Sequence, residues 1–154
     1  MAKTKKKSAK VRTKKTSKVA TKKAVQKAVS KRTLPTKPQY LSWHNVETEL
    51  VNPLFDRQMI TGHNVMFARL LLRKGCIVPL HNHHNEQITF VLEGALKFEI
   101  DGREIIVRAG EVLAIPPHMP HRVEALEDTI DFDIFDPPRE DWINRTDQYL
   151  RGVK

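Results

Sequence analysis

Hydrophobic and polar residues alternate in short runs along most of the chain. Residues 55–61 alternate weakly, residues 96–100 and 103–107 alternate more clearly, and residues 65–72 form a nearly continuous apolar run. A period of two places successive side chains on opposite faces of a strand. Asp101-Gly102 separates two of these runs, and this dipeptide is among the strongest short signals for a β-hairpin. Short strands separated by turns predict an all-β domain, an antiparallel sandwich or barrel.

The two ends of the chain depart from this pattern. Residues 1–38 lack aromatic residues and a sustained apolar face, so burial could not offset the entropy lost on ordering them. We therefore predict a disordered tail over residues 1–38 and one folded domain over residues 39–154. Asp136-Pro137-Pro138 ends the last strand, and Asp and Pro suit the N-cap and first turn of a helix. A short C-terminal helix is expected there, packed on the barrel by its large side chains, Trp142, Ile143 and Tyr149.

Charge also separates the tail from the domain. Residues 1–38 contain 15 Lys or Arg and no Asp or Glu, whereas the rest of the chain holds 12 of the 27 basic residues and all 18 acidic ones. A basic arm attracts nucleic acid by releasing condensed counterions, without reading the base sequence. We expect residues 1–38 either to contact RNA or DNA non-specifically or to be a solvated extension with no dedicated partner.

The chain has a single cysteine, Cys76, which excludes an intramolecular disulfide and suits a reducing compartment. No stretch approaches the ~18 to 20 consecutive apolar residues of a membrane span. The charged N-terminus is not followed by the apolar core of a secretory signal. The expected location is the cytoplasm, without membrane contact.

The candidate chemistry lies in residues 75–94, which read GCIVPLHNHHNEQITFVLEG. His81 and His83 are two residues apart, so on a strand both imidazoles would point to the same face. Such a pair offers a metal ion two ligands of fixed separation. The residues that follow, Ile88 to Leu92, are rich in β-branched and aromatic side chains, as a strand should be.

The spacing Gly-x5-His-x-His-x3-Gln-x6-Gly of residues 75–94 resembles the first signature motif of the cupins, small β-barrels that hold one metal ion. Residues 110–125 resemble the second cupin motif, with His118 where Gly is usual and Ala125 where Asn is usual. The resemblance implies a jelly-roll-like cupin barrel. It also implies four metal ligands, His81, His83, Gln87 and His121.

Most cupins have Glu where this chain has Gln87. Glu86 is the rival ligand, but it lies one residue short of the motif and points outward if Gln87 points inward. His84 is out of phase with the ligand pair, and His118 lies in a Pro-rich turn, so neither is expected to bind the metal. Zn²⁺, Ni²⁺, Mn²⁺ and Fe²⁺ all suit imidazole ligands. A neutral Gln leaves the ion its full charge, which lowers the expectation of an iron oxygenase that relies on a carboxylate ligand, without excluding it.

The run Asp131-Phe132-Asp133-Ile134-Phe135 alternates and so turns two carboxylates and one aromatic ring toward the metal side of the last strand. A carboxylate beside a bound substrate could move a proton, and Arg139 could pair with a substrate carboxylate in bidentate fashion. The alternative is that both carboxylates lie in water at the barrel mouth and that Arg139 forms a surface ion pair.

Three stretches, HNHHNEQITFVLEGALKFEIDG, PPHMPHRVEAL and DIFDPPREDW, resemble the single-domain cupins known as pectin degradation proteins. Those enzymes convert unsaturated uronates, released by polysaccharide lyases, into their linear, ketonised form. The resemblance covers most of residues 55–145 and implies a metal held by three His and one Gln. It further implies a homodimer and a catalytic Asp-x-Phe-x3-Arg element at Asp133, Phe135 and Arg139.

We therefore expect a metal-dependent isomerase or tautomerase of small unsaturated uronates. Two alternatives stay open: a non-catalytic ligand-binding cupin tethered to nucleic acid by residues 1–38, and an iron-dependent oxygenase. Hydrolysis through a side-chain nucleophile is not expected, because neither a Ser-His-Asp nor a Cys-His arrangement is legible in the sequence.

Overall fold

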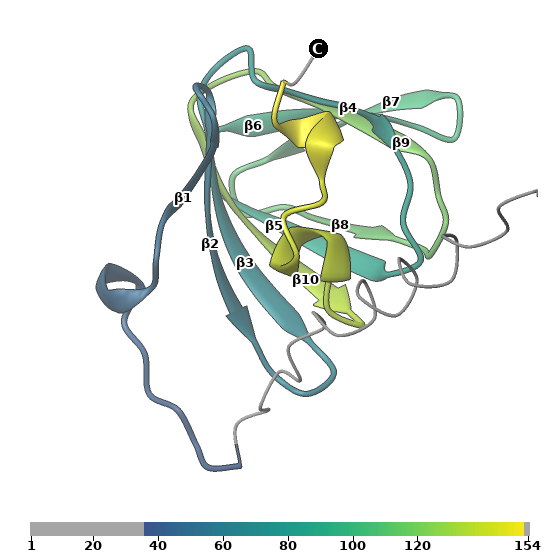
Figure 1. Cartoon of the computed structure of the whole chain (residues 1–154). Coiled ribbons are helices and arrows are strands. Elements are labelled where there is room, and N and C mark those ends of the chain that lie inside the picture. The colour runs from purple at the N-terminus through teal and green to yellow at the C-terminus, as the bar shows by residue number, and fades with distance from the viewer. Residues whose placement is uncertain (1–35, 153–154) are drawn as a thin grey trace, which may run out of the picture. The chain divides into compact units, whose positions relative to one another are not determined.

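A computed structural model of the chain describes residues 36–152 (Figure 1). Within this part, ten strands follow one another as β1 (Glu49–Asn52), β2 (Phe55–Thr61), β3 (Met66–Leu72), β4 (Ile77–His81), β5 (Glu86–Glu93), β6 (Ala95–Ile100), β7 (Arg103–Arg108), β8 (Val112–Ile115), β9 (His121–Ala125) and β10 (Thr129–Asp136). They form one sheet in the order β1-β2-β3-β10-β5-β8 and a second in the order β4-β9-β6-β7. The two sheets face each other, and all their pairings are antiparallel, which confirms the predicted all-β class.

The alternating runs of the sequence become strands. The weak run at residues 55–61 is β2, and the apolar run at residues 65–72 becomes β3 from Met66 onward. Asp101 and Gly102 join β6 to β7 with φ of 51° and 69°, as a two-residue hairpin turn with positive φ at both positions requires. Strand β1 was not predicted from the sequence. The predicted tail lies mostly outside the described residues, so its boundary at residue 38 stays a prediction.

The core lies between the two sheets and follows directly from the alternation. On β10 the side chains of odd-numbered residues are buried and those of even-numbered residues are more exposed, and β3 shows the opposite parity. Apolar side chains fill the floor of this space, among them Phe55, Leu70, Leu72, Leu96 and Phe98. Polar residues occupy other inward positions, including Gln87, His121, Asp131 and Asp133. The polar group is thus built on the same strands as the core.

A short C-terminal segment follows β10 and lies at one end of the two sheets (Figure 1). It contains α2 (Glu140–Ile143) and the 3-10 turn η2 (Gln148–Leu150). The N-cap of α2 is Arg139, so the prediction that Asp136 caps this helix is wrong. Asp136 still pairs with Glu86 in the sheet, so its backbone belongs to the strand. Trp142 is buried, as predicted.

No helix in residues 36–152 is long and apolar enough to span a membrane.

Buried charges attach this C-terminal segment to the sheet. Arg57, fully buried on β2, donates from Nη1 to Asp147 at 2.6 Å and from Nε to Glu49 at 2.8 Å. Arg151 donates to the same two carboxylates, at 2.8 Å and 2.7 Å respectively. Removing one partner of such a network is costly because it leaves a buried charge without a counter-ion. The network therefore holds η2 in one position at the end of the barrel.

Two glycines with positive φ, Gly94 and Gly75, offer a matched test of the close packing at the start of β10. A Cβ at Gly94 would lie 2.5 Å from both the Asp128 carbonyl oxygen and Thr129 Oγ1, whereas a Cβ at Gly75 would meet nothing within 4 Å. We expect Gly75→Ala to lower the free energy of unfolding by about 1 kcal/mol, the cost of positive φ for a residue with a Cβ. Gly94→Ala should cost a further ~1–3 kcal/mol from overpacking. Denaturant unfolding of both variants measures the difference, and equal losses would contradict the close approach.

Candidate metal centre

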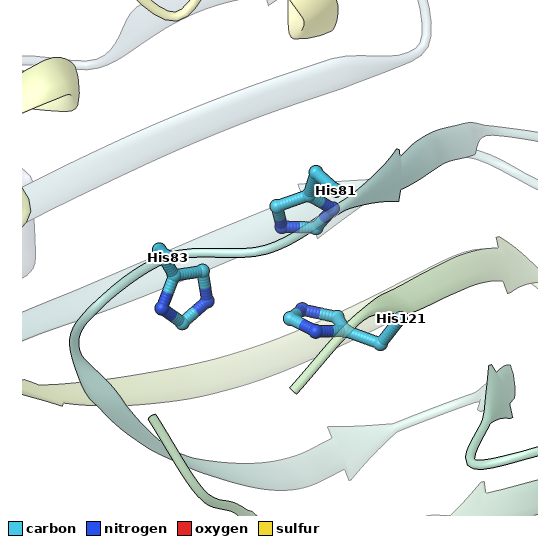
Figure 2. A group of neighbouring side chains, drawn as sticks. All are labelled: His81, His83 and His121. Atoms are coloured by element: carbon cyan, nitrogen blue, oxygen red, sulfur yellow. The ribbon is translucent and has the colours of Figure 1, made fainter. Parts of the chain in front are cut away.

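Three histidines come together at one end of the space between the sheets. The ligand atoms that His81, His83 and His121 offer all lie within 4.8 Å of one another (Figure 2). His81 is the last residue of β4, His121 is the first of β9, and the two are partners in the sheet register. His83 lies beyond the end of β4, so the prediction that it shares a strand face with His81 is wrong. The loop after β4 turns its imidazole back toward the other two.

Each imidazole is oriented by a backbone carbonyl two residues away. The contacts from Nδ1 are His81 to Pro79 at 2.9 Å, His83 to Asn85 at 3.0 Å, and His121 to Met119 at 2.8 Å. A carbonyl oxygen can only accept, so Nδ1 carries the ring proton and Nε2 keeps its lone pair. Three Nε2 lone pairs are thereby left for a ligand in the shared space, as metal-binding histidines require.

Gln87 supplies a fourth donor atom from β5. Its Nε2 donates to Asp133 Oδ1 at 3.0 Å and to Thr89 Oγ1 at 2.9 Å, which turns its Oε1 toward His83. Oε1 lies 3.1 Å from His83 Nε2. Because the proton of His83 is on Nδ1, two acceptors face each other there, and a cation would satisfy both lone pairs. The residues therefore fit a divalent ion held by three imidazoles and one amide carbonyl.

Burial and positive neighbours keep the three imidazoles uncharged. Burial, together with the nearby His121, lowers the pKa of His81 to about 3. Burial and the Arg139 guanidinium lower the pKa of His83 to about 4, and burial also lowers the pKa of His121. All three rings are therefore neutral near pH 7, the form in which imidazole binds metals.

The neighbouring residues that the sequence analysis set aside do not join this cluster. Glu86 and His84 are exposed, and Glu86 points away from the side on which Gln87 is buried. His118 is exposed and has a φ of 64°, a left-handed conformation that explains why Gly is usual at this position of the motif. Its backbone N–H donates to the His83 carbonyl at 2.7 Å. Cys76 is buried in the core, where burial and then Asp131 raise the pKa of its thiol to about 11.

Asp131 and Asp133 point inward from β10 and are both buried. This excludes the alternative in which they lie in water at the barrel mouth. Burial raises the pKa of Asp133 to about 6, although hydrogen bonds from Thr89 and Gln87 act in the opposite direction. Burial and the charge of Asp133 raise the pKa of Asp131 well above its ordinary value. Burial therefore favours the protonated form of Asp131, and Asp133, with a pKa of about 6, is the carboxyl that can exchange a proton near neutral pH.

Arg139 is buried beside the same cavity and is not a surface residue. Its guanidinium lies over the rings of Phe135 and Trp142, at 5.2 Å and 4.8 Å from their centroids. Nε and Nη2 donate to the two carboxylate oxygens of Asp141 at 2.9 Å and 2.8 Å. That bidentate edge is therefore occupied, which leaves Nη1 for a ligand. Phe135 also meets the His83 ring edge-on, with centroids 5.6 Å apart, so it supports both side chains.

These side chains line one cavity, whose walls include His81, Gln87, His121, Asp131, Asp133, Phe135 and Arg139. Trp142, Tyr149 and Leu150 of the C-terminal segment also line it. Tyr149 was assigned only to packing by the sequence analysis, yet its ring stacks on His81 with centroids 4.9 Å apart. The cavity is small, with a volume of about 30 Å³. A sugar-sized ligand can therefore enter only if the side chains that line the cavity move apart.

Comparison with known proteins identifies relatives of this fold. Residues 68–136 match the family model described as "Cupin domain". An uncharacterised protein of Methanocaldococcus jannaschii is 28% identical over 89 residues, which cover 57% of this chain and 68% of that protein. Residues 68–136, which match the cupin-domain model, include both the histidine cluster and the inward carboxylates of β10.

Solved structures agree with this match. A RmlC-like cupin from Shewanella frigidimarina has a TM-score of 0.65 and 28% identity, covering 69% of this chain and 96% of that one. KdgF from a Halomonas species has a TM-score of 0.65 and 26% identity, covering 69% of this chain and 99% of that one. Oxalate decarboxylase from Bacillus subtilis, a protein with Mn(II) centres, has a TM-score of 0.58 and 22% identity over 69% of this chain and 32% of its own, and it shares the fold alone.

The ligand set can be tested by metal analysis. We expect the purified protein to contain about one divalent ion per chain, and His121→Ala to lose most of it, because an outer-sphere change alone weakens binding by about 10- to 100-fold. His84→Ala, at an exposed neighbour of the cluster, is the matched control and should keep its metal. Elemental analysis and metal titration measure both. Equal metal content in the two variants would contradict the assignment.

Proposed function

We propose that the protein is a metal-dependent isomerase or tautomerase of small unsaturated uronates, a proposal supported by the match of residues 68–136 to the cupin-domain model. One observation carries the proposal: the cavity lined by His81, His121, Gln87 and Asp133 lies at a cluster of three imidazoles, which His83 completes. The substrate class rests on the resemblance of Asp133, Phe135 and Arg139 to the catalytic element of the pectin degradation proteins.

A divalent ion held by His81, His83, Gln87 and His121 would supply Lewis-acid polarisation of a substrate oxygen. Gln87 is neutral, so the ligands add no negative charge to the site. This supports Lewis-acid work on a sugar acid over the chemistry of oxygenases with a carboxylate ligand. Zn²⁺, Ni²⁺, Mn²⁺ and Fe²⁺ all suit the donor set.

Asp133 is proposed to carry the proton. Ketonisation of an enol moves a proton from oxygen to carbon, so it needs a group that can both accept and return one. Gln87 and the Thr89 hydroxyl both donate to Oδ1 of Asp133, which leaves Oδ2 for the substrate. The raised pKa of Asp133, about 6, lets it exchange a proton near neutral pH. Gln87 joins this carboxyl to the histidine cluster through one rigid amide.

Arg139 and Phe135 are proposed to position the substrate and the ligands. Nη1 of Arg139 is buried and has no hydrogen-bond partner within residues 36–152, so it is free to bind a substrate carboxylate. Phe135 is a positioning residue, because it packs against the rings of His83 and Trp142 and under the Arg139 guanidinium. A uronate enters only if side chains at the narrow mouth, such as Tyr149, shift.

The reaction and the role of Asp133 have one joint test. With a 4,5-unsaturated uronate, the wild type should remove the ultraviolet absorbance of the conjugated double bond faster than buffer does. Asp133→Asn should lower kcat by about 10²- to 10⁴-fold, the usual contribution of a positioned acid or base. Asp136→Asn, an exposed residue of the same strand, is the control. A wild type no faster than buffer would overturn the activity, and equal rates in the two variants would overturn the role of Asp133.

Residues 1–38 are proposed to contact nucleic acid without sequence specificity. Residues 1–35 lie outside the described part of the chain, so this proposal rests on the sequence: 15 Lys or Arg and no acidic residue. Binding of this kind releases counterions and weakens as salt concentration rises. We also propose a cytoplasmic location. The proposal rests on the single cysteine of the chain, Cys76, which is a buried free thiol and suits a reducing compartment.

A homodimer is proposed to form through the outer face of the six-stranded sheet. Phe67, Ile134 and Ile88 stand side by side in the register of β3, β10 and β5, and all three are exposed. Leu92 and Val112 extend the apolar face along β5 and β8 and are also exposed. A contiguous apolar patch of this kind is typical of a protein interface.

Two isoleucines of nearly equal exposure test the dimer. Ile134 is 38% exposed on the six-stranded sheet, and Ile106 is 39% exposed on β7 of the other sheet. Ile134→Lys should shift the protein toward monomer, because it places a charge in the apolar interface, while Ile106→Lys should not. Sedimentation equilibrium over a range of concentrations gives the mass of each variant. A wild type that stays monomeric throughout would rule out the dimer.

A further inference from the structure

Besides Nε1 of Trp142, the cavity lining contains two hydrogen-bond donors that lack acceptors within residues 36–152. One is Nη1 of Arg139, which is buried with no partner. The other is the hydroxyl of Tyr149, which accepts a hydrogen bond from Arg139 Nη2 at 2.8 Å. A phenol has one proton besides its lone pairs, and within residues 36–152 no acceptor hydrogen-bonds to this one. Both side chains line the cavity that holds the histidine cluster.

The planar guanidinium of Arg139 brings these two donors to the same place. Its five N–H groups point in fixed directions. The carboxylate of Asp141 accepts a hydrogen bond from the N–H of Nε and another from one N–H of Nη2. The Tyr149 oxygen accepts a hydrogen bond from the second N–H of Nη2. That second N–H shares an edge with one N–H of Nη1, which therefore points alongside the Tyr149 oxygen. Phe135 and Trp142 pack against the guanidinium from one side, because their ring centroids, 5.2 Å and 4.8 Å from its Cζ, are only 5.0 Å from each other.

Tyr149 is held in this position and is protonated. Asp147, two residues before Tyr149, accepts a hydrogen bond from the buried Arg57. The ring of Tyr149 stacks on His81 with an interplanar angle of 26°. Burial raises the pKa of the Tyr149 hydroxyl, although the Arg139 charge opposes this. The hydroxyl therefore keeps its proton at neutral pH and can donate it.

We propose that Tyr149 and Nη1 of Arg139 form a carboxylate subsite, with Tyr149 as a substrate-binding residue that no motif in the sequence identified. One carboxylate oxygen accepts from Nη1 and the other from the Tyr149 hydroxyl. An anion with two acceptor oxygens satisfies both donors, whereas Asp141 neutralises the Arg139 charge without using Nη1. The identity of the carboxylate as that of a sugar acid rests on the proposed function. The stacking on His81 places this subsite beside the metal ligands.

The two tyrosines of the chain make the subsite directly observable. Tyr40 is 98% exposed and does not line the cavity, so it serves as an internal control. Full-length protein labelled with 3-fluorotyrosine should give two fluorine resonances, which Tyr40→Phe assigns. Adding D-galacturonate should shift the Tyr149 resonance alone, and D-galactose, which lacks the carboxylate, should not shift it. No shift up to the highest soluble galacturonate concentration, or an equal shift with galactose, would overturn the subsite.

Kinetics separate this inference from the proposed reaction. Tyr149→Phe keeps the ring that packs on His81 and removes only the hydroxyl. It should raise KM for the unsaturated uronate, and Kd for galacturonate, by about 10- to 100-fold, with a smaller effect on kcat and no loss of metal. If the wild type turns over but Tyr149→Phe has the KM of Tyr40→Phe, the subsite fails and the reaction stands. If galacturonate shifts Tyr149 but no turnover occurs, the subsite stands and the reaction fails.

Discussion

The site depends on the contacts that the Gln87 amide makes with Asp133 and His83. Its Nε2 donates to Asp133 and its Oε1 faces His83, so one planar group sets the position of the carboxyl relative to the histidines. This also explains why an amide stands where most cupins have Glu. A carboxylate at this position would lie against the buried Asp133, and two adjacent buried carboxylates cannot both ionise without large cost. The amide offers Asp133 a donor instead and still presents an oxygen to the metal side.

Burial sets the protonation state of every group around this amide. Desolvation disfavours the charged form of each side chain, so the same environment keeps the imidazoles neutral and raises the pKa of both carboxyls of β10. Asp131 and Asp133 respond differently because Thr89 and Gln87 donate to Asp133, while Oδ1 of Asp131 is buried without a partner in the described chain. Burial thus favours the protonated form of Asp131, whereas Asp133, with its two donors, is the group that can exchange a proton.

The C-terminal segment completes the cavity from outside the two sheets. The ion pair between Arg57 and Asp147 holds η2, and this places Tyr149 against His81 and Arg139. The guanidinium groups of Arg57 and Arg139 both lie over the Trp142 ring, so this ring contacts the arginine that holds the C-terminal segment and the arginine of the site. The C-terminal segment therefore both closes one end of the barrel and supplies the Tyr149 hydroxyl to the cavity.

The sequence by itself determined the all-β class, the hairpin at Asp101-Gly102 and the position of Asp131 and Asp133 on one face of their strand. These follow from the period of two and from turn chemistry, which are local properties of the chain. Only the tertiary structure decided that β4 ends before His83, that Asp136 remains in its strand, and that Asp141 and Tyr149 surround Arg139. Strand ends depend on where the partner strand stops pairing, and a guanidinium bonds whichever acceptors packing brings near. Such neighbours are set by contacts between distant segments, which no local pattern encodes.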